Sequence, residues 1–277
     1  VACACAALLV ANSAWADAYR SLLATTIALS VGERAISLTV HQWINDGLMA
    51  VFFLLVGLEI KREAIAGELA SPRQAALPIA AAIGGMIVPA SIYILTNGGG
   101  LESRGWAIPM ATDIAFALAV LLIAARTLPP ALKIFLLAIA IFDDLGAILI
   151  IALFYSSGVA FWPLMLAGAV IGLLALANHL QVGSLVVYGV LGIALAVLFG
   201  QGGVHATLAG VVTGLSIPLV STERGEHSPL DKAMHLAHPW VTYLVLPVFA
   251  FVSAGVAAPE SATWAVVRSI RGREVQA

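Results

Sequence analysis

The sequence is dominated by apolar stretches long enough to cross a lipid bilayer. They recur at about residues 1–13, 47–60, 75–96, 105–125, 131–155, 160–177, 183–200, 203–220 and 239–257. A spanning helix needs roughly 20 apolar residues, and the second stretch reaches that length if it begins near Ile36. The stretches are continuously apolar rather than alternating, which favours helices over the strands of a membrane barrel. We therefore expect an all-α integral membrane protein, a polytopic helix bundle of about nine spans.

The composition supports this interpretation and excludes other classes. Charged residues make up 10% of the chain and the mean hydropathy is +1.03, whereas soluble domains carry about 25% charged residues. The 277 residues leave no room for a soluble second domain, so we treat 1–277 as a single polytopic membrane domain in contact with membrane lipid. A net charge of -2, spread along the chain, excludes nucleic acid as a partner.

The positions of basic residues predict the orientation, because short cytoplasmic loops collect Lys and Arg. Seven follow the even-numbered stretches: Lys61, Arg62, Arg73, Arg126, Lys133, Arg224 and Lys232. Three follow the odd-numbered ones: Arg20, Arg34 and Arg104. This asymmetry predicts a cytoplasmic N-terminus. The tail breaks the rule, because the ninth stretch would place its arginines outside.

Two adjacent carboxylates, Asp143 and Asp144, lie near the middle of the fifth stretch. From Lys133 to Asp143 a helix rises about 15 Å, half of the hydrocarbon core. A charged Asp at that depth costs about 2.5 to 3.5 kcal/mol, so two in succession indicate a function. The alternative is a polar pair that joins helices by hydrogen bonds, which Asn or Ser would do at lower cost.

The aspartate pair has the chemistry to hold either protons or a cation. Neighbouring helical side chains point about 100° apart, so the two reach one ion only from a seam between them, or one of them binds through water. Burial and like charge both favour the protonated carboxyl, and a small hard cation prefers the same oxygens. We therefore expect Na⁺ or Li⁺ to compete with H⁺ at Asp143 and Asp144, with no cofactor.

A third carboxylate, Asp113, lies in the fourth stretch after Pro109 and Thr112. Proline removes a backbone donor and opens the helix one turn earlier, and a broken helix offers dipole ends and free carbonyls to ions. We expect a broken fourth helix in which Thr112 and Asp113 belong to the ion site. The alternative is a proline kink in which Asp113 caps the second half of the helix.

Other polar residues allow two interpretations each. A charge cluster follows the second stretch: Glu59, Lys61, Arg62 and Glu63. It either tunes a response to pH or forms a solvated, self-paired helix end. His205, at the start of the eighth stretch, either titrates near neutral pH or makes a structural hydrogen bond.

Four glycines lie within the apolar stretches: Gly84, Gly85, Gly210 and Gly214. A helix without a side chain at such a position can approach its neighbour closely. We expect these glycines to permit close helix packing.

At these residues the sequence resembles the bacterial NhaA family of Na⁺/H⁺ antiporters. The resemblance rests on five segments in order: Trp43–Glu63, Ala111–Ala117, Leu132–Ala147, Gly203–Gly210 and His238–Phe251. They cover most of the chain from residue 43 to about residue 256. The resemblance implies inverted repeats and broken helices, of which this family is an established example.

The resemblance also implies a function and a set of site residues. It implies a secondary transporter, not an enzyme, that exchanges cytoplasmic Na⁺ or Li⁺ for external H⁺ in the bacterial inner membrane, for pH and sodium homeostasis, and that forms a homodimer. By matching motif, Asp143 and Asp144 bind the ion and carry protons, with Thr112 and Asp113 in the unwound helix. The segment from Glu59 to Glu63 and His205 fall where the family responds to pH.

The chain departs from the family pattern in several places. We expect a sequence truncated at both ends, with the C-terminal spans of the inverted repeat missing and 258–277 forming a divergent or truncated tail. Met234 replaces an expected acidic residue and Ser253 an expected asparagine. One alternative is therefore a truncated, non-transporting member of the family. A remote alternative is an intramembrane aspartic protease, in which Asp113 and Asp143 would share a proton.

Overall fold

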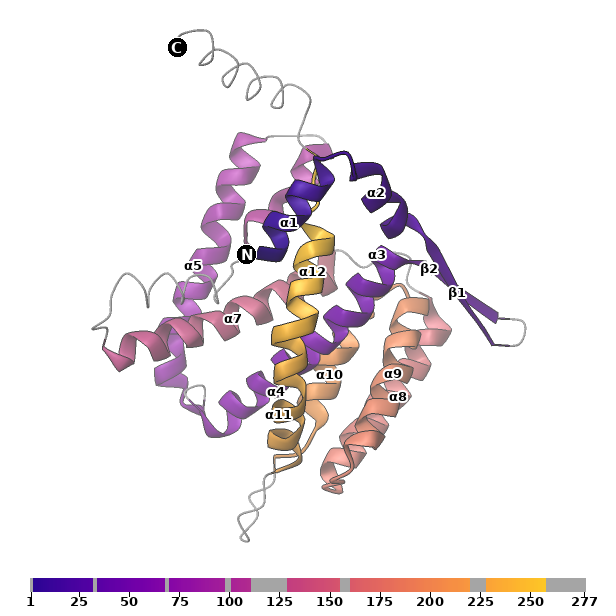
Figure 1. Cartoon of the computed structure of the whole chain (residues 1–277). Coiled ribbons are helices and arrows are strands. Elements are labelled where there is room, and N and C mark those ends of the chain that lie inside the picture. Colours follow the sequence, from indigo (N-terminus) through magenta and orange to yellow (C-terminus); the bar gives the residue numbers. More distant parts are fainter. Residues whose placement is uncertain are drawn as a thin grey trace. The chain divides into compact units, whose positions relative to one another are not determined.

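The structure is a computed structural model that describes residues 2–31, 34–67, 70–97, 101–110, 129–154, 160–219 and 228–257. The chain forms two compact units, Val1–Met49 with Pro239–Ala277, and Ala50–His238. The N-terminal elements are α1 (Ala2–Ala11), α2 (Ala16–Ala24), β1 (Thr26–Val31), β2 (Arg34–Thr39), α3 (Val40–Gln42), η1 (Trp43–Leu48), α4 (Met49–Ala66) and α5 (Pro72–Thr96) (Figure 1). The later elements are η3 (Leu101–Met110), α7 (Pro130–Phe154), α8 (Phe161–His179), α9 (Leu185–Gln201), α10 (Leu208–Ser216), α11 (Pro229–Trp240), η4 (Val241–Val245) and α12 (Leu246–Ser253).

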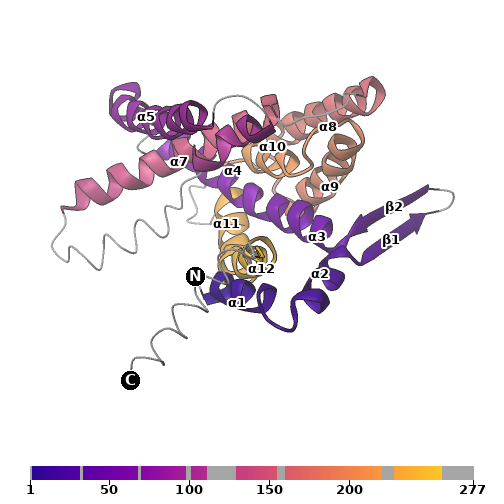
Figure 2. The same cartoon turned by 90° about the horizontal axis from the view of Figure 1, so that it is seen from above.

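In the first unit, α1 lies along α12 (Figures 1 and 2). The buried Tyr19 hydroxyl donates to the carbonyls of Phe251 at 2.7 Å and Val252 at 3.1 Å. The Asn12 side chain donates to the carbonyl of Val256 at 3.0 Å. The last carbonyls of a helix have no partner within it, so the Tyr19 hydroxyl satisfies the end of α12, while Asn12 binds the segment that follows the helix.

The first unit also contains a feature that the all-α prediction missed, the antiparallel hairpin of β1 and β2. Its register pairs Thr26 with Thr39 and Val31 with Arg34. Both segments contain β-branched residues, such as Ile27, Val31 and Ile36, which are enriched in strands. The indole of Trp43 donates to the carbonyl of Ile27 at 3.2 Å and thereby ties the hairpin to η1.

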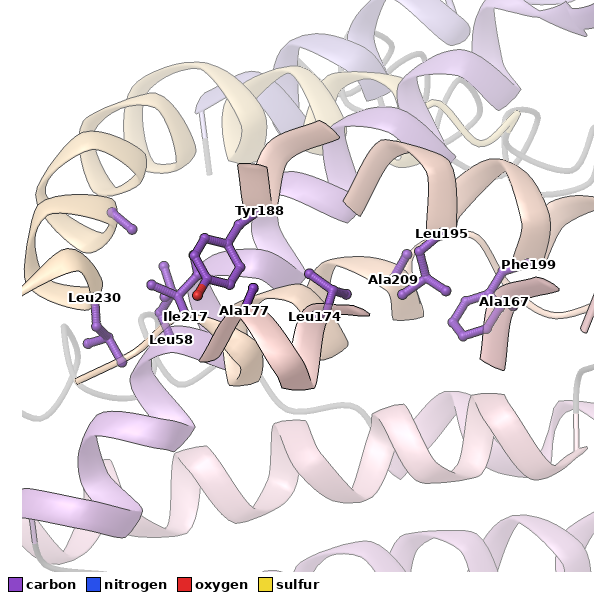
Figure 3. Close-up of a cluster of buried hydrophobic side chains, with 11 residues drawn as sticks. Leu58, Ala167, Leu174, Ala177, Tyr188, Leu195, Phe199, Ala209, Ile217 and Leu230 are labelled. Carbon is purple, nitrogen blue, oxygen red and sulfur yellow. The ribbon is translucent and has the colours of Figure 1, made fainter. Parts of the chain in front are cut away.

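In the second unit, α8 and α9 pack side by side and α10 packs against both. Their shared core is an apolar cluster that also includes side chains of α4 and α11: Leu58, Ala167, Leu174, Ala177, Tyr188, Leu195, Phe199, Ala209, Ile217, Leu230 and Ala233 (Figure 3). The Tyr188 ring lies among them, and its buried hydroxyl has no hydrogen-bond partner within the described part of the chain. Burial of so much apolar surface fixes α8, α9 and α10 as one body.

Glycines bring α4 and α10 into backbone contact in the second unit. A Cβ atom placed at Gly57 of α4 would lie 2.6 Å from the carbonyl oxygen of Val211. From α10, a Cβ at Gly214 would lie 2.5 Å from the Leu54 oxygen, and one at Gly210 would lie 2.9 Å from the Leu54 nitrogen. The close packing predicted for Gly210 and Gly214 is confirmed.

The glycines of α5 behave differently. This helix packs against α7 and η3, but no described atom lies within 4 Å of a Cβ placed at Gly84 or Gly85. Gly85 is exposed. Among the described contacts, the close packing expected at these two positions is therefore not found.

Four helical segments in the described residues are long and apolar enough to cross a membrane: Val40–Ala66, Ala75–Thr96, Phe161–His179 and Pro229–Ser253. Shorter apolar helices are Ala2–Ala11 and Leu185–Gln201. The eighth stretch contains only the nine-residue helix α10, which is too short to span a bilayer alone. The helical membrane class is thus supported, while the count of about nine spans stays a prediction.

Candidate functional site

The two adjacent aspartates lie near the middle of a long helix, as the sequence predicted. Helix α7 has 25 residues, of which 13 precede Asp143 and 10 follow Asp144. Asp143 is 4% exposed and Asp144 is half-buried. Burial of a carboxylate is costly unless it is paired, protonated or bound to a cation. The pair therefore has the environment of a functional site rather than of a solvated surface.

The two carboxylates lie on faces of α7 that meet different neighbours. Asp143 is one turn from Gly146, where a Cβ atom would collide with the Met86 sulfur of α5. Asp144 is one turn from Ile148, which is buried in a cluster with Val56 and Ile60 of α4 and Val211 of α10. Residues three or four apart share a helix face. Asp143 is therefore on the side of α5, and Asp144 is on the side of α4 and α10.

Glu59 of α4 belongs to the surroundings of this pair. It precedes the buried Ile60, which contacts the same cluster as Ile148 of α7. Glu59 is half-buried, and its charge acts on the Asp144 carboxyl. A negative charge near the pair favours a bound cation or a retained proton. Of the predicted pH-response residues, this one is brought to the aspartates.

Lys61 points to a different part of the second unit. Its ammonium donates to the backbone carbonyl of Ile217 at 2.7 Å and lies 3.5 Å from the Asn178 side-chain oxygen. Arg62 is exposed, and Glu63 is half-buried. Within the predicted charge cluster, Lys61 thus reaches other helices, while the charges of Glu63 and Arg62 act on Glu59 of the same helix.

The remaining predicted site residues are placed only in part. Thr112 and Asp113 lie outside the described residues, so the broken fourth helix stays a prediction. The segment before them, η3, is a 3₁₀ helix that contains Pro109. His205 is half-buried in the segment that precedes α10, where its carbonyl accepts from the Leu208 nitrogen at 3.1 Å.

The described residues contain no group of three or more His, Cys, Asp or Glu side chains arranged to hold a metal ion. An alkali ion that is transported rather than resident needs oxygen ligands of any kind, including carbonyls and water. Asp143 and Asp144 supply two carboxylates from adjacent positions. The remaining ligands would have to come from other groups.

Three groups that contact the helices of the candidate site were not predicted from the sequence. Met86 packs behind Gly146 and so sets how closely α5 approaches the aspartate helix. Asn178 and the carbonyl of Ile217 receive the Lys61 ammonium. The one available signal was Asn178, a lone amide at the end of an otherwise apolar stretch. A methionine and a backbone carbonyl carry no such signal.

Comparison with known proteins gives consistent results. The sequence model described as Na⁺/H⁺ antiporter 1 matches residues 1–271. A Shewanella oneidensis protein named Na(+)/H(+) antiporter NhaA is 53% identical over 253 residues, 91% of this chain. A Yersinia pseudotuberculosis protein of the same name is 51% identical over 251 residues, 90% of this chain. These relatives are named as antiporters and not as enzymes.

The chain spans 64% of the Shewanella protein and 63% of the Yersinia protein. The matches cover nearly all of the present sequence and therefore include the aspartate helix, α4 and α10.

Proposed function

Because the chain belongs to the Na⁺/H⁺ antiporter 1 family, we propose that it is a secondary transporter that exchanges cytoplasmic Na⁺ or Li⁺ for external H⁺. It is an integral membrane protein by family and by its apolar helices. The proposal places it in the bacterial inner membrane with a cytoplasmic N-terminus, as a homodimer, in the service of pH and sodium homeostasis.

The observation that carries the proposal is the burial of Asp143 beside Asp144 in the middle of α7. Two adjacent carboxylates in an apolar helix repel each other and lack water, so both charges persist only with a cation bound. When the cation leaves, protons neutralise the same oxygens. A single site that holds either Na⁺ or H⁺ exchanges one for the other if it opens to the two sides in turn.

Other residues complete the proposed site. Thr112 and Asp113 would add oxygen ligands and a helix end to the site. Glu59 adds negative charge next to Asp144. The proposed pH response involves Glu59 with the neighbouring Lys61, Arg62 and Glu63, and the separate His205. No cofactor is required, because the driving force is the proton gradient itself.

The test is Na⁺-dependent collapse of a pH gradient in everted membrane vesicles that contain this chain. Na⁺ is expected to dequench a ΔpH dye, and Asp143→Asn or Asp144→Asn is expected to abolish the signal. The matched control is Asp17→Asn, since the Asp17 side chain is 99% exposed on α2. The apparent KM for Na⁺ should rise as the pH falls, because protons occupy the same oxygens.

The same assay decides the alternatives. If the signal does not exceed that of the Asp143→Asn/Asp144→Asn variant, the chain is a non-transporting member of the family. An apparent KM that stays flat with pH, in an active protein, would refute competition at one site. Intramembrane proteolysis has no support in the comparisons, whose relatives are named as antiporters.

A further inference from the structure

Lys61 makes a long-range polar contact from α4 to two other helices. Its ammonium donates to the carbonyl of Ile217 at 2.7 Å, with Asn178 Oδ1 at 3.5 Å. Asn178 lies near the end of α8, and Ile217 is the C-terminal cap of α10. One side chain of α4 therefore reaches the ends of two other helices.

The positive charge of the Lys61 ammonium matches the partial negative charge of the groups that accept its hydrogen bonds. The C-terminus of a helix carries partial negative charge and unpaired carbonyls, which attract a cation. Ile217 is 3% exposed and lies in the apolar cluster with Leu58 and Tyr188 (Figure 3). A charge-assisted hydrogen bond is stronger where water is excluded. The contact is thus built as an anchor and not as a transient surface pair.

The anchor is continuous with the backbone contacts between α4 and α10. Gly57 is one helical turn before Lys61 and lies against Val211, while Gly214 lies against Leu54. These glycine contacts continue along α4 as far as Leu58, whose nitrogen would lie 2.9 Å from a Cβ at Gly214, and none is found beyond Leu58 in the described residues. In the last turns of α4, the contact with α10 is made by the Lys61 side chain instead.

The position of Glu59 depends on those same turns. Glu59 and Lys61 are two residues apart, so their side chains point to nearly opposite sides of α4. Lys61 faces the ends of α8 and α10, and Glu59 is beside Ile60, whose cluster includes Ile148 of α7. Holding Lys61 therefore fixes how far Glu59 extends towards the aspartate helix.

We propose that Lys61 is a positioning residue: it anchors α4 to the ends of α10 and α8 and thereby sets the distance between the Glu59 carboxylate and the ion at Asp144. The anchor stands on its own geometry, while its effect on the ion rests on the proposed function. Lys61 itself does not touch the ion.

The anchor is tested without any transport measurement. Spin labels at Ile65→Cys on α4 and Leu215→Cys on α10, both exposed positions, report the distance between the two helix ends once Cys3 and Cys5 are replaced by serine. Lys61→Met is expected to lengthen or broaden the distance distribution. Lys61→Arg keeps a cation that reaches the carbonyl, and Arg62→Met alters an exposed neighbour, so both should match the unsubstituted Lys61 chain. An unchanged distribution in Lys61→Met overturns the proposal.

The effect on the ion is tested in vesicles. Lys61→Met should raise the apparent KM for Na⁺ about tenfold, the change that loss of one nearby charge interaction produces, with kcat within about twofold. Lys61→Arg should restore KM. In a Glu59→Gln background, Lys61→Met should cause no further change, because Lys61 acts through Glu59.

A full additional change in that background, or a loss of kcat alone, overturns the positioning role. If the unsubstituted chain neither transports nor binds Na⁺, the proposed function and the positioning role fail, while the spin-label distances still decide the anchor.

Discussion

Replacement of Gly57 by alanine should destabilise the protein through the contact between α4 and α10. The added Cβ would lie 2.6 Å from the Val211 carbonyl oxygen and 3.1 Å from the Val211 Cα. Both are backbone atoms, so no side-chain rotation relieves the overlap. Since carbon and carbonyl oxygen normally approach to about 3.3 Å, the two helices must separate locally by roughly 0.7 Å.

The magnitude follows from a comparison with Gly84. Overpacking of this kind costs about 1–3 kcal/mol, whereas Gly→Ala in a helix interior gains up to about 1 kcal/mol from propensity. Gly84 lies inside α5 with no described atom within 4 Å of the added Cβ. Gly84→Ala therefore shows the propensity gain alone. The difference in stability between the two variants should be about 1–3 kcal/mol, with Gly57→Ala the less stable.

The assay is thermal unfolding of both variants and the parent chain in the same detergent, followed by tryptophan fluorescence and by size-exclusion chromatography of the heated sample. For a chain of this size the expected gap is roughly 2–12 °C in Tm. Equal Tm values for Gly57→Ala and Gly84→Ala would refute the claim that α4 and α10 meet through their backbones.

Two further substitutions separate side-chain from backbone contacts. Gly146→Ala places a Cβ against the side chain of Met86, and because a methionine can change rotamer the cost should stay below about 1.5 kcal/mol. A Tm loss as large as that of Gly57→Ala would contradict relief of this contact by rotation of the Met86 side chain. Tyr19→Phe keeps the ring contact with Phe251 at 5.5 Å but removes the bonds to the carbonyls of Phe251 and Val252. It should cost about 1–3 kcal/mol by the same Tm assay, and an unchanged Tm would refute a capping role for the hydroxyl.

The aspartate pair could be singled out from the sequence as a candidate site because its signal is local. Two carboxylates in the middle of an apolar stretch are unusual wherever the helix lies, since the cost of burying them does not depend on the fold. The same holds for long apolar segments such as 75–96 and 160–177, which the structure contains as the helical segments Ala75–Thr96 and Phe161–His179. A free-energy cost that depends only on the local sequence can be predicted without knowing which helices pack around it.

Features that depend on tertiary context could not be predicted in this way. The segment 26–39 forms a hairpin, but its short apolar runs do not distinguish a strand from the start of a helix. Gly84 and Gly210 look alike in sequence, yet among the described residues Gly210 meets a neighbouring backbone and Gly84 does not. Lys61 looked like a solvated helix end, and its acceptors are 117 and 156 residues away along the chain.

The placement of the pair across two faces of α7 makes the two aspartates unequal. Asp143 is the more buried, on the side where Met86 of α5 packs at Gly146. Asp144 is on the side of α4, where the charge of Glu59 acts on it. The two side chains point about 100° apart, so one ion can be reached by both only from the seam between them. A different helix lies on each side of that seam. Since α4 carries Glu59 on one face and is held to α10 through the other, movement of α4 relative to α7 would change the surroundings of Asp144 more than those of Asp143.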